Sequence, residues 1–226
     1  MFDFPKQAEL NRLLPKSKVY EFAKPSRAVR DRFVRQIGEI VWKYKLAPET
    51  INLPARHGIE EIQVFGIALK TRELSAVALR PVLLTIDKAI PSPIFYQLTF
   101  GDRVKFAAAY KRPSDVQPAK SVVEGYYFET PWQPAGGKDT ALPPLPVALD
   151  LAGLYEQMLR RLLPVPARPD EPLREHVERV NQIHAKETEC RRLDARLRRE
   201  LQFNRKVEIN AALRIRQTEL AQLEKA

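Results

Sequence analysis

The chain has 226 residues, of which 44% are hydrophobic and 29% are charged, and its formal net charge is +10. This length allows one ordinary domain with an appendage, and the hydrophobic share excludes a wholly disordered chain. The charge favours acidic partners: nucleic acid, an acidic protein surface or anionic lipid.

The single cysteine, Cys190, excludes an internal disulfide framework and a cysteine-rich zinc site. No apolar run approaches the ~18 residues that span a bilayer. The opening MFDFPKQAEL has no apolar segment of the kind found in signal peptides. We therefore expect a cytoplasmic protein with no membrane partner.

Helix signals dominate the first fifty residues. A short helix is predicted over 6–14. A second helix is predicted after Ser26, with an apolar face at helical spacing up to Val41 and an end between Trp42 and Leu46. Strand signals follow, and the remaining elements of the domain are a strand over 61–70, a helix over 75–89, strands over 94–100, 104–110 and 122–130, a proline-rich loop over 133–147 and a helix over 151–163. Because the later strands form a meander, we expect an α+β fold with a mixed or antiparallel sheet of about four strands and flanking helices.

The distribution of helix breakers marks the main boundary. All 19 prolines lie at or before Pro172, and all 8 glycines lie at or before Gly153. The residues that follow are rich in good helix formers. The sequence therefore predicts an α+β domain over 1–163, a stiff proline-rich linker over 164–172 and a long basic helical arm over 173–226.

The apolar positions of the arm repeat imperfectly at heptad spacing, too irregularly for a simple two-stranded coiled coil. Two structures remain open. The arm can self-associate as a coiled coil, which would make a homo-oligomer, or it can fold as an αα-hairpin that breaks near Gln202-Phe203-Asn204.

The arm is basic, with 13 Lys/Arg and 9 Asp/Glu from Leu173 onward. Five arginines cluster within nine residues: Arg191, Arg192, Arg196, Arg198 and Arg199. They can form a solvated face balanced by acidic neighbours, or they can contact phosphates, which the guanidinium fork matches well.

A second candidate contact surface is Trp42 with Lys43 and Lys45. Nucleic-acid bases can stack on such a ring while the lysines contact phosphates. The alternative is that the ring belongs to the core of the domain. These three residues and the arginine cluster are the predicted nucleic-acid or partner contacts.

No catalytic, cofactor-binding or metal-binding residues are predicted. The strand EIQVFGIALK has Ala68 where a restriction-type nuclease needs a glutamate two residues before Lys70. The histidines, His57, His176 and His184, lack metal-ligand spacing, and the Gly136-Gly137-Lys138 segment lacks the first glycine of a phosphate loop. A divergent Mg²⁺-dependent nuclease would need carboxylates such as Glu61, Asp87 and Glu124 to converge in three dimensions.

Several segments resemble the bacterial family described as domain of unknown function 4391. They are FDFPKQAELNRLLPKSKVYE, IVWKYKLAPETINL, EIQVFGIAL, IDKAIPSPIFYQL, AAYKR, YYFETPW, LDLAGLYEQMLRRLL and RELQFNRKVEINAALR, and they cover most of the chain in order. The resemblance implies no assigned activity and no catalytic motif. It implies companionship with DNA methyltransferase and helicase subunits in restriction-like, phage-defence gene clusters.

Charge and resemblance together favour a non-enzymatic accessory subunit of such a DNA-processing complex. The domain would dock on a helicase/nuclease or methyltransferase partner, and the arm would contact DNA backbone or oligomerise. The alternatives are the divergent nuclease and a purely structural coiled-coil oligomeriser.

Overall fold

The computed structural model describes residues 2–71, 76–114, 116–117, 121–135 and 142–225. The chain divides into two compact units, Met1–Leu162 and Leu163–Ala226. We call the first the sheet domain and the second the hairpin unit, and each is described by itself.

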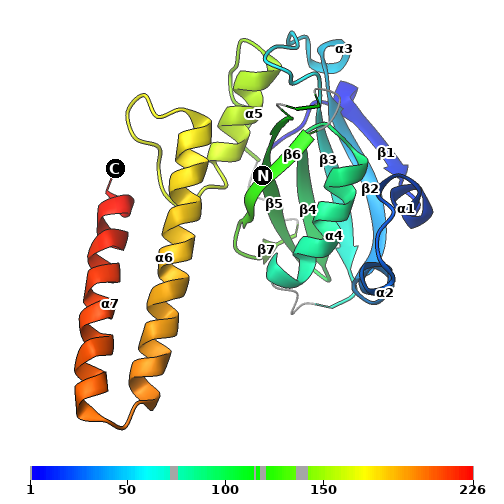
Figure 1. The fold of residues 1–226 in the computed structure, drawn as a ribbon. Coiled ribbons are helices and arrows are strands. Elements are labelled where there is room, and N and C mark those ends of the chain that lie inside the picture. Colours follow the sequence, from blue (N-terminus) through cyan, green and yellow to red (C-terminus); the bar gives the residue numbers. More distant parts are fainter. Residues whose placement is uncertain (1, 72–75, 115, 118–120, 136–141, 226) are drawn as a thin grey trace. The chain divides into compact units, whose positions relative to one another are not determined.

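The sheet domain is built on one mixed sheet (Figure 1). Its strands within the described residues are β1 (Glu9–Leu13), β2 (Ile37–Leu46), β3 (Ile62–Leu69), β4 (Ile94–Phe100), β5 (Arg103–Pro113), β6 (Ser121–Glu129) and β7 (Gln133–Pro134). The first six follow one another in space, and β7 pairs with β5. Only the β3–β4 pair among these is parallel, because helix α4 (Ala76–Ala89) crosses between the two strands. The expected α+β class and mixed sheet are therefore confirmed.

The predicted number of about four strands was too low, since the described part of the sheet has seven. The main cause is β2, which was predicted as the second half of a helix. That helix, α2 (Arg27–Gln36), ends where the run IGEIVWKYKL begins, and the run's β-branched and aromatic residues favour a strand once a neighbour is present to pair with it. Residues 9–13 also form a strand, rather than part of the predicted helix over 6–14, because they pair with β2.

Helices cover both faces of the sheet. Besides α2 and α4, the domain has a 3-10 turn, η1 (Lys6–Ala8), and helices α1 (Lys16–Ala23), α3 (Pro48–Ile51) and α5 (Leu151–Arg160). Apolar side chains of α1, α2 and α4 share one core cluster with residues such as Phe65 and Tyr96. Tyr155 of α5 packs against Phe95, which neighbours Tyr96 and therefore points to the opposite face. The strand predicted over 94–100 is confirmed. The helix predicted over 75–89 is found at 76–89, with Ser75 outside the described residues, and the helix predicted over 151–163 ends at Arg160.

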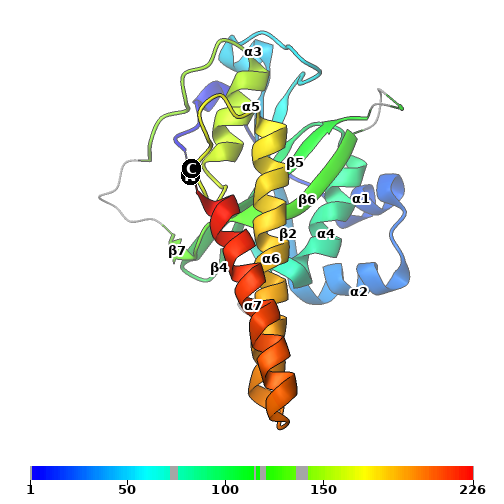
Figure 2. The ribbon, with the colours of Figure 1, turned by 60° about the vertical axis from the view of Figure 1, so that its left-hand side comes forward.

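The hairpin unit contains two antiparallel helices, α6 (Leu173–Arg199) and α7 (Phe203–Glu224), which lie side by side in Figures 1 and 2. Of the two structures left open by the heptad pattern, the chain adopts the αα-hairpin, and the break at 200–202 lies beside the predicted one. Two ion pairs join the helices: Lys186 Nζ lies 2.6 Å from Glu219 Oε2, and Arg216 Nε lies 3.2 Å from Glu189 Oε2.

Two arginines tie the proline-rich segment to the open end of the hairpin. The Arg168 guanidinium donates to the carbonyl of Lys225 at the end of α7. Arg179 of α6 donates to the carbonyls of Pro166 and Leu223 and to both carboxylate oxygens of Glu171. The segment before α6 is therefore hydrogen bonded to both helices of its own unit.

Among the described helices, none combines the length and the apolar composition needed to cross a bilayer.

Candidate functional site

The predicted contact residues of β2 are separated by a bulge. The pairing register between β2 and β3 shifts between Trp42 and Tyr44, so Lys43 is the extra residue. Trp42 and Lys45 consequently face the side of the sheet that α1, α2 and α4 cover, where the Trp42 ring stacks on Phe65 with centroids 6.0 Å apart. Trp42 therefore packs on the core cluster and does not stand free as a stacking platform.

Both lysines beside Trp42 have acceptors inside the domain. Lys45 Nζ lies 2.9 Å from Glu49 Oε1 and 3.1 Å from Glu61 Oε2, and these hydrogen bonds raise the pKa of Lys45. The Lys43 side chain crosses β3 over Gly66 and donates to Gln97 Oε1 at 2.9 Å, and burial lowers its pKa. A Cβ at Gly66 would lie 3.0 Å from Lys43 Cε, so the absence of a side chain there makes room for the lysine.

An apolar pocket of about 200 Å³ adjoins Trp42. Its walls include Leu14, Phe22 and Ile90, and its polar members are Lys18, Glu61 and Gln63. Gln63 Oε1 accepts a 2.7 Å hydrogen bond from Trp42 Nε1, and Glu61 is held by Lys45. Lys18 Nζ lies 3.1 Å from Glu21 Oε2, so each of the three polar side chains has its own partner in the domain.

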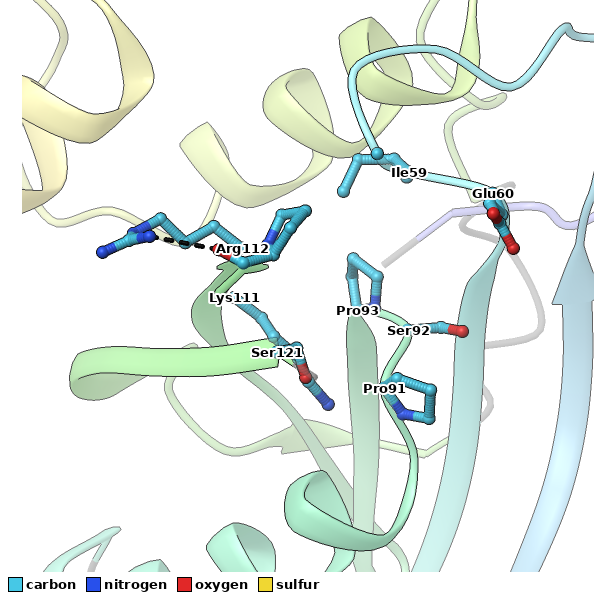
Figure 3. Close-up of a pocket in the computed structure, with 10 residues that line it drawn as sticks. Ile59, Glu60, Pro91, Ser92, Pro93, Lys111, Arg112 and Ser121 are labelled. Atoms are coloured by element: carbon cyan, nitrogen blue, oxygen red, sulfur yellow. Dashed lines mark hydrogen bonds between the residues drawn. The ribbon is translucent and has the colours of Figure 1, made fainter. Parts of the chain in front are cut away.

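A second pocket, of about 180 Å³, lies between the end of β5 and the segment before β4 (Figure 3). The side chains of Glu60 and Arg112 point in opposite directions away from its centre, and Arg112 Nη1 donates to the carbonyl of Pro113 at 3.1 Å. The prolines Pro91 and Pro93 form much of the remaining wall. No set of polar groups converges on this pocket among its described lining residues.

The three carboxylates considered for a nuclease each bind a different cation. Glu61 pairs with Lys45, Asp87 pairs with Lys111 at 3.0 Å, and Glu124 pairs with Arg112 at 2.6 Å. Over the described ranges, no three His, Cys, Asp or Glu side chains gather in a group that could hold a metal ion. The structure thus does not bring these carboxylates together.

Asp87 and Lys111 form a buried polar network that the sequence pattern does not predict. The Lys111 ammonium donates to Asp87 Oδ1 and to the carbonyls of Asp87 and Ile90, which lie at the end of α4. Tyr96 and Tyr127 donate to Asp87 Oδ2, and burial raises the pKa of both phenols. Each of these groups has hydrogen-bond partners, so the network joins α4 to the sheet and has no group aimed at a ligand.

The histidines and the cysteine do not gather into a site. His57 lies in a tight turn with a positive φ of 52°, and His176 is buried with Nε2 2.9 Å from the carbonyl of Val165. His184 and Cys190 lie on α6. The Gly136-Gly137-Lys138 segment lies outside the described residues.

The arginine cluster lies on the half of α6 that leads to the hairpin turn. Arg191, Arg192, Arg196, Arg198 and Arg199 are all exposed. Arg191 lies 3.8 Å from Glu187, and Arg198 lies 2.8 Å from Asp194; both contacts are exposed pairs within the helix. Such exposed pairs contribute little to stability, so these arginines can leave their carboxylates and bind another anion at little cost.

The turn brings further cations beside the last three arginines. We define the hairpin tip as residues 196–207, which surround the turn at the closed end of the hairpin in Figure 2. Its charged residues are Arg196, Arg198, Arg199, Glu200, Arg205 and Lys206. The Glu200 carboxylate accepts from the backbone N–H groups of Leu201 and Gln202, at 2.9 and 3.0 Å, and these bonds lower its pKa. Five cations therefore share the tip with one carboxylate, and that carboxylate is bonded to the turn.

The sheet domain carries a second basic surface, on a segment where the sequence pattern indicates only a helix. Arg27, Arg30 and Arg35 are exposed on α2, and Arg30 stacks over the Tyr20 ring. A count of charges helix by helix could have found it. Arg27 and Arg35 of this surface, together with Arg12 of β1, serve as a control for the tip.

Comparison with known proteins gives a family but no relative of known function. No curated protein and no solved structure matches the chain. The family model described as "Domain of unknown function (DUF4391)" matches residues 2–220, which include the sheet domain and almost all of the hairpin unit. This match spans both units, as the resemblance of the separate segments implied. The chain belongs to the DUF4391 family.

Proposed function

We propose that the protein is a non-enzymatic accessory subunit of a DNA-processing complex and that its hairpin tip contacts the DNA backbone. The observation that carries the proposal is the group of five cations around one turn: Glu200 is the only carboxylate within residues 196–207, and Asp194, one helical turn before, pairs with Arg198. Such a group creates a local positive potential that attracts phosphates and releases counterions on binding.

Helix stability alone does not account for this charge arrangement. Arg196, Arg198 and Arg199 lie in the last turn of α6, where the helix dipole favours cations. Arg205 and Lys206 lie at the start of α7, where the positive end of the α7 dipole disfavours cations. That start has no acidic residue in its first turn and no side-chain cap from Gln202. A bound anion at the tip would contact both the cations and the start of α7, which has no side-chain cap.

The first prediction concerns the salt dependence of DNA binding. Replacing Arg196, Arg198 and Arg199 with Glu should weaken binding to a short duplex and lower the slope of log K against log salt by about 2 to 3, since each lost phosphate contact removes ~0.9. Fluorescence anisotropy with a labelled duplex at several salt concentrations measures both quantities. The matched control reverses three exposed arginines of the sheet domain, Arg12, Arg27 and Arg35. An unchanged slope in the tip variant, or an equal loss in the control, would show that the tip is not the contact.

The second part of the proposal is the partner. The family resemblance supports a helicase/nuclease or DNA methyltransferase encoded nearby, acting with this subunit in a cytoplasmic, restriction-like defence complex. Expression of the natural gene neighbourhood with a tag on this chain should recover one of these enzymes in stoichiometric amount. Recovery of the tagged chain alone would contradict the docking role, and Mg²⁺-dependent nicking by the purified chain would contradict the non-enzymatic role.

A further inference from the structure

The hairpin tip also exposes apolar side chains that phosphate contacts do not explain. Leu201 is 92% exposed, Phe203 is 77% exposed and Val207 is 52% exposed. Leu201 lies in the turn and Phe203 is the first residue of α7, with Arg198 and Arg199 before them and Arg205 and Lys206 after them. The chain therefore alternates from cations to apolar groups and back to cations within nine residues.

Hydrogen bonds within the turn fix the backbone that carries these side chains. The backbone of Glu200 and Gln202 is extended, with φ and ψ of −70° and 136° at Glu200. The Glu200 carboxylate accepts from two turn N–H groups, and the Lys206 N–H donates to the Gln202 carbonyl at 3.0 Å. Because these bonds already order the turn backbone, binding requires less backbone ordering.

We infer that the tip binds DNA with unpaired bases, with Phe203 and Leu201 contacting the base faces and the flanking cations contacting the phosphates. The inference rests on the proposed function and narrows its substrate to single-stranded or locally opened DNA. Charge complementarity selects a polyanion as the occupant. In a closed duplex the base faces are stacked, whereas a single strand presents base faces and phosphates together. Phe203 can stack on any base, so the site needs no particular sequence.

The experiment compares a labelled oligothymidine of twenty nucleotides with a duplex of the same length, using the full chain. Phe203→Ala should lower affinity for the single strand about fivefold or more and should leave duplex affinity nearly unchanged. Its salt slope should stay that of the unchanged protein, since stacking releases no counterions. Leu201→Ala should act in the same direction with a smaller effect, because it has no ring to stack.

The sheet domain supplies matched controls. Phe22 is 68% exposed and Leu149 is 90% exposed, so Phe22→Ala and Leu149→Ala remove equivalent groups from another part of the chain and should leave both affinities unchanged. Phe203→Trp keeps an aromatic ring and should therefore bind the single strand about as tightly as the unchanged protein. Its added fluorescence, measured as the difference from the unchanged protein, should be quenched by the oligothymidine.

The outcomes separate this inference from the proposed function. One outcome is that reversal of Arg196, Arg198 and Arg199 weakens binding, whereas Phe203→Ala leaves the ratio of single-strand to duplex affinity as it is in the unchanged protein. The tip would then be a phosphate contact only, and the inference would be overturned. Loss of a co-purified protein partner in Phe203→Ala, with DNA affinities intact, would also overturn it by assigning the ring to a protein contact. If the unchanged protein binds neither DNA, both the proposed DNA contact and the inference fail.

Discussion

Replacing Lys111 with Met is expected to lower the free energy of unfolding of the sheet domain by about 3–5 kcal/mol. The side chain is 1% exposed, and its partner Asp87 is 4% exposed. The replacement would leave the Asp87 carboxylate buried without a cation and would remove the donor for two carbonyls at the end of α4. Urea denaturation followed by tryptophan fluorescence reports on this domain alone, since Trp42 and Trp132 both lie in it.

Lys105 provides a control on the same strand. It is also buried, and its Nζ lies 2.6 Å from Glu129 Oε2, but Glu129 is 30% exposed and can regain water. Lys105→Met should therefore cost about 1–2 kcal/mol, which is less than the loss at Lys111. The double variant Lys111→Met with Asp87→Asn should cost less than the two single changes added together, because it removes the uncompensated charge. An equal loss at Lys105, or additive losses in the double variant, would contradict this account of the network.

Replacing Arg179 with Met should have the largest effect in the hairpin unit, about 3 kcal/mol. Arg179 and Glu171 are 5% and 7% exposed, and Arg179 also donates to the carbonyls of Pro166 and Leu223. Without it, the proline-rich segment and the end of α7 lose their common donor. Amide hydrogen exchange should show reduced protection over the first half of α6 and the last turn of α7. The exposed pair Arg174–Glu178 on the same helix is the control, and Arg174→Met should change protection by no more than about 0.5 kcal/mol.

The Arg179–Glu171 pair also predicts that the stability of the hairpin unit depends on pH. Hydrogen bonds from Arg179 hold the pKa of Glu171 at about 2, below its value in an unfolded chain. A lowered folded-state pKa contributes stability above the unfolded value of about 4.3, and that contribution is lost as the pH falls towards the folded value. Circular dichroism should therefore show the urea midpoint of the hairpin unit falling between about pH 4.5 and 2. Glu171→Gln should reduce this fall, and an identical pH profile in that variant would assign the dependence to other groups.

The helical unit and its basic end could be predicted from the sequence because they depend on local properties. Helix formation after Pro172 follows from propensity and from the absence of breakers, and the positions of Arg196 to Arg199 follow from the chain itself. The choice of a hairpin could not be predicted, since the irregular heptads fit a partner helix of the same chain as well as one of another chain.

The candidate contacts on β2 show the opposite case. Trp42, Lys43 and Lys45 are close in sequence, but the bulge at Lys43 sends it to one side of the sheet and the other two to the opposite side. A bulge arises from the pairing of two strands and leaves no clear local signal. The same holds for the Lys111–Asp87 pair, whose members are 24 residues apart and meet only because α4 packs on β5.

The sequence by itself thus determined the α+β class, the central strand–helix–strand unit, the long helices and the basic, proline-free end of the chain. These features depend on composition, periodicity and helix breakers, which act within a few residues. Only the tertiary structure decided that residues 37–46 form a strand, that three predicted contacts on it are separated and internally bonded, and that Leu201 and Phe203 stand exposed among five cations. Strand pairing and helix packing make those choices, because they depend on residues far apart in the chain.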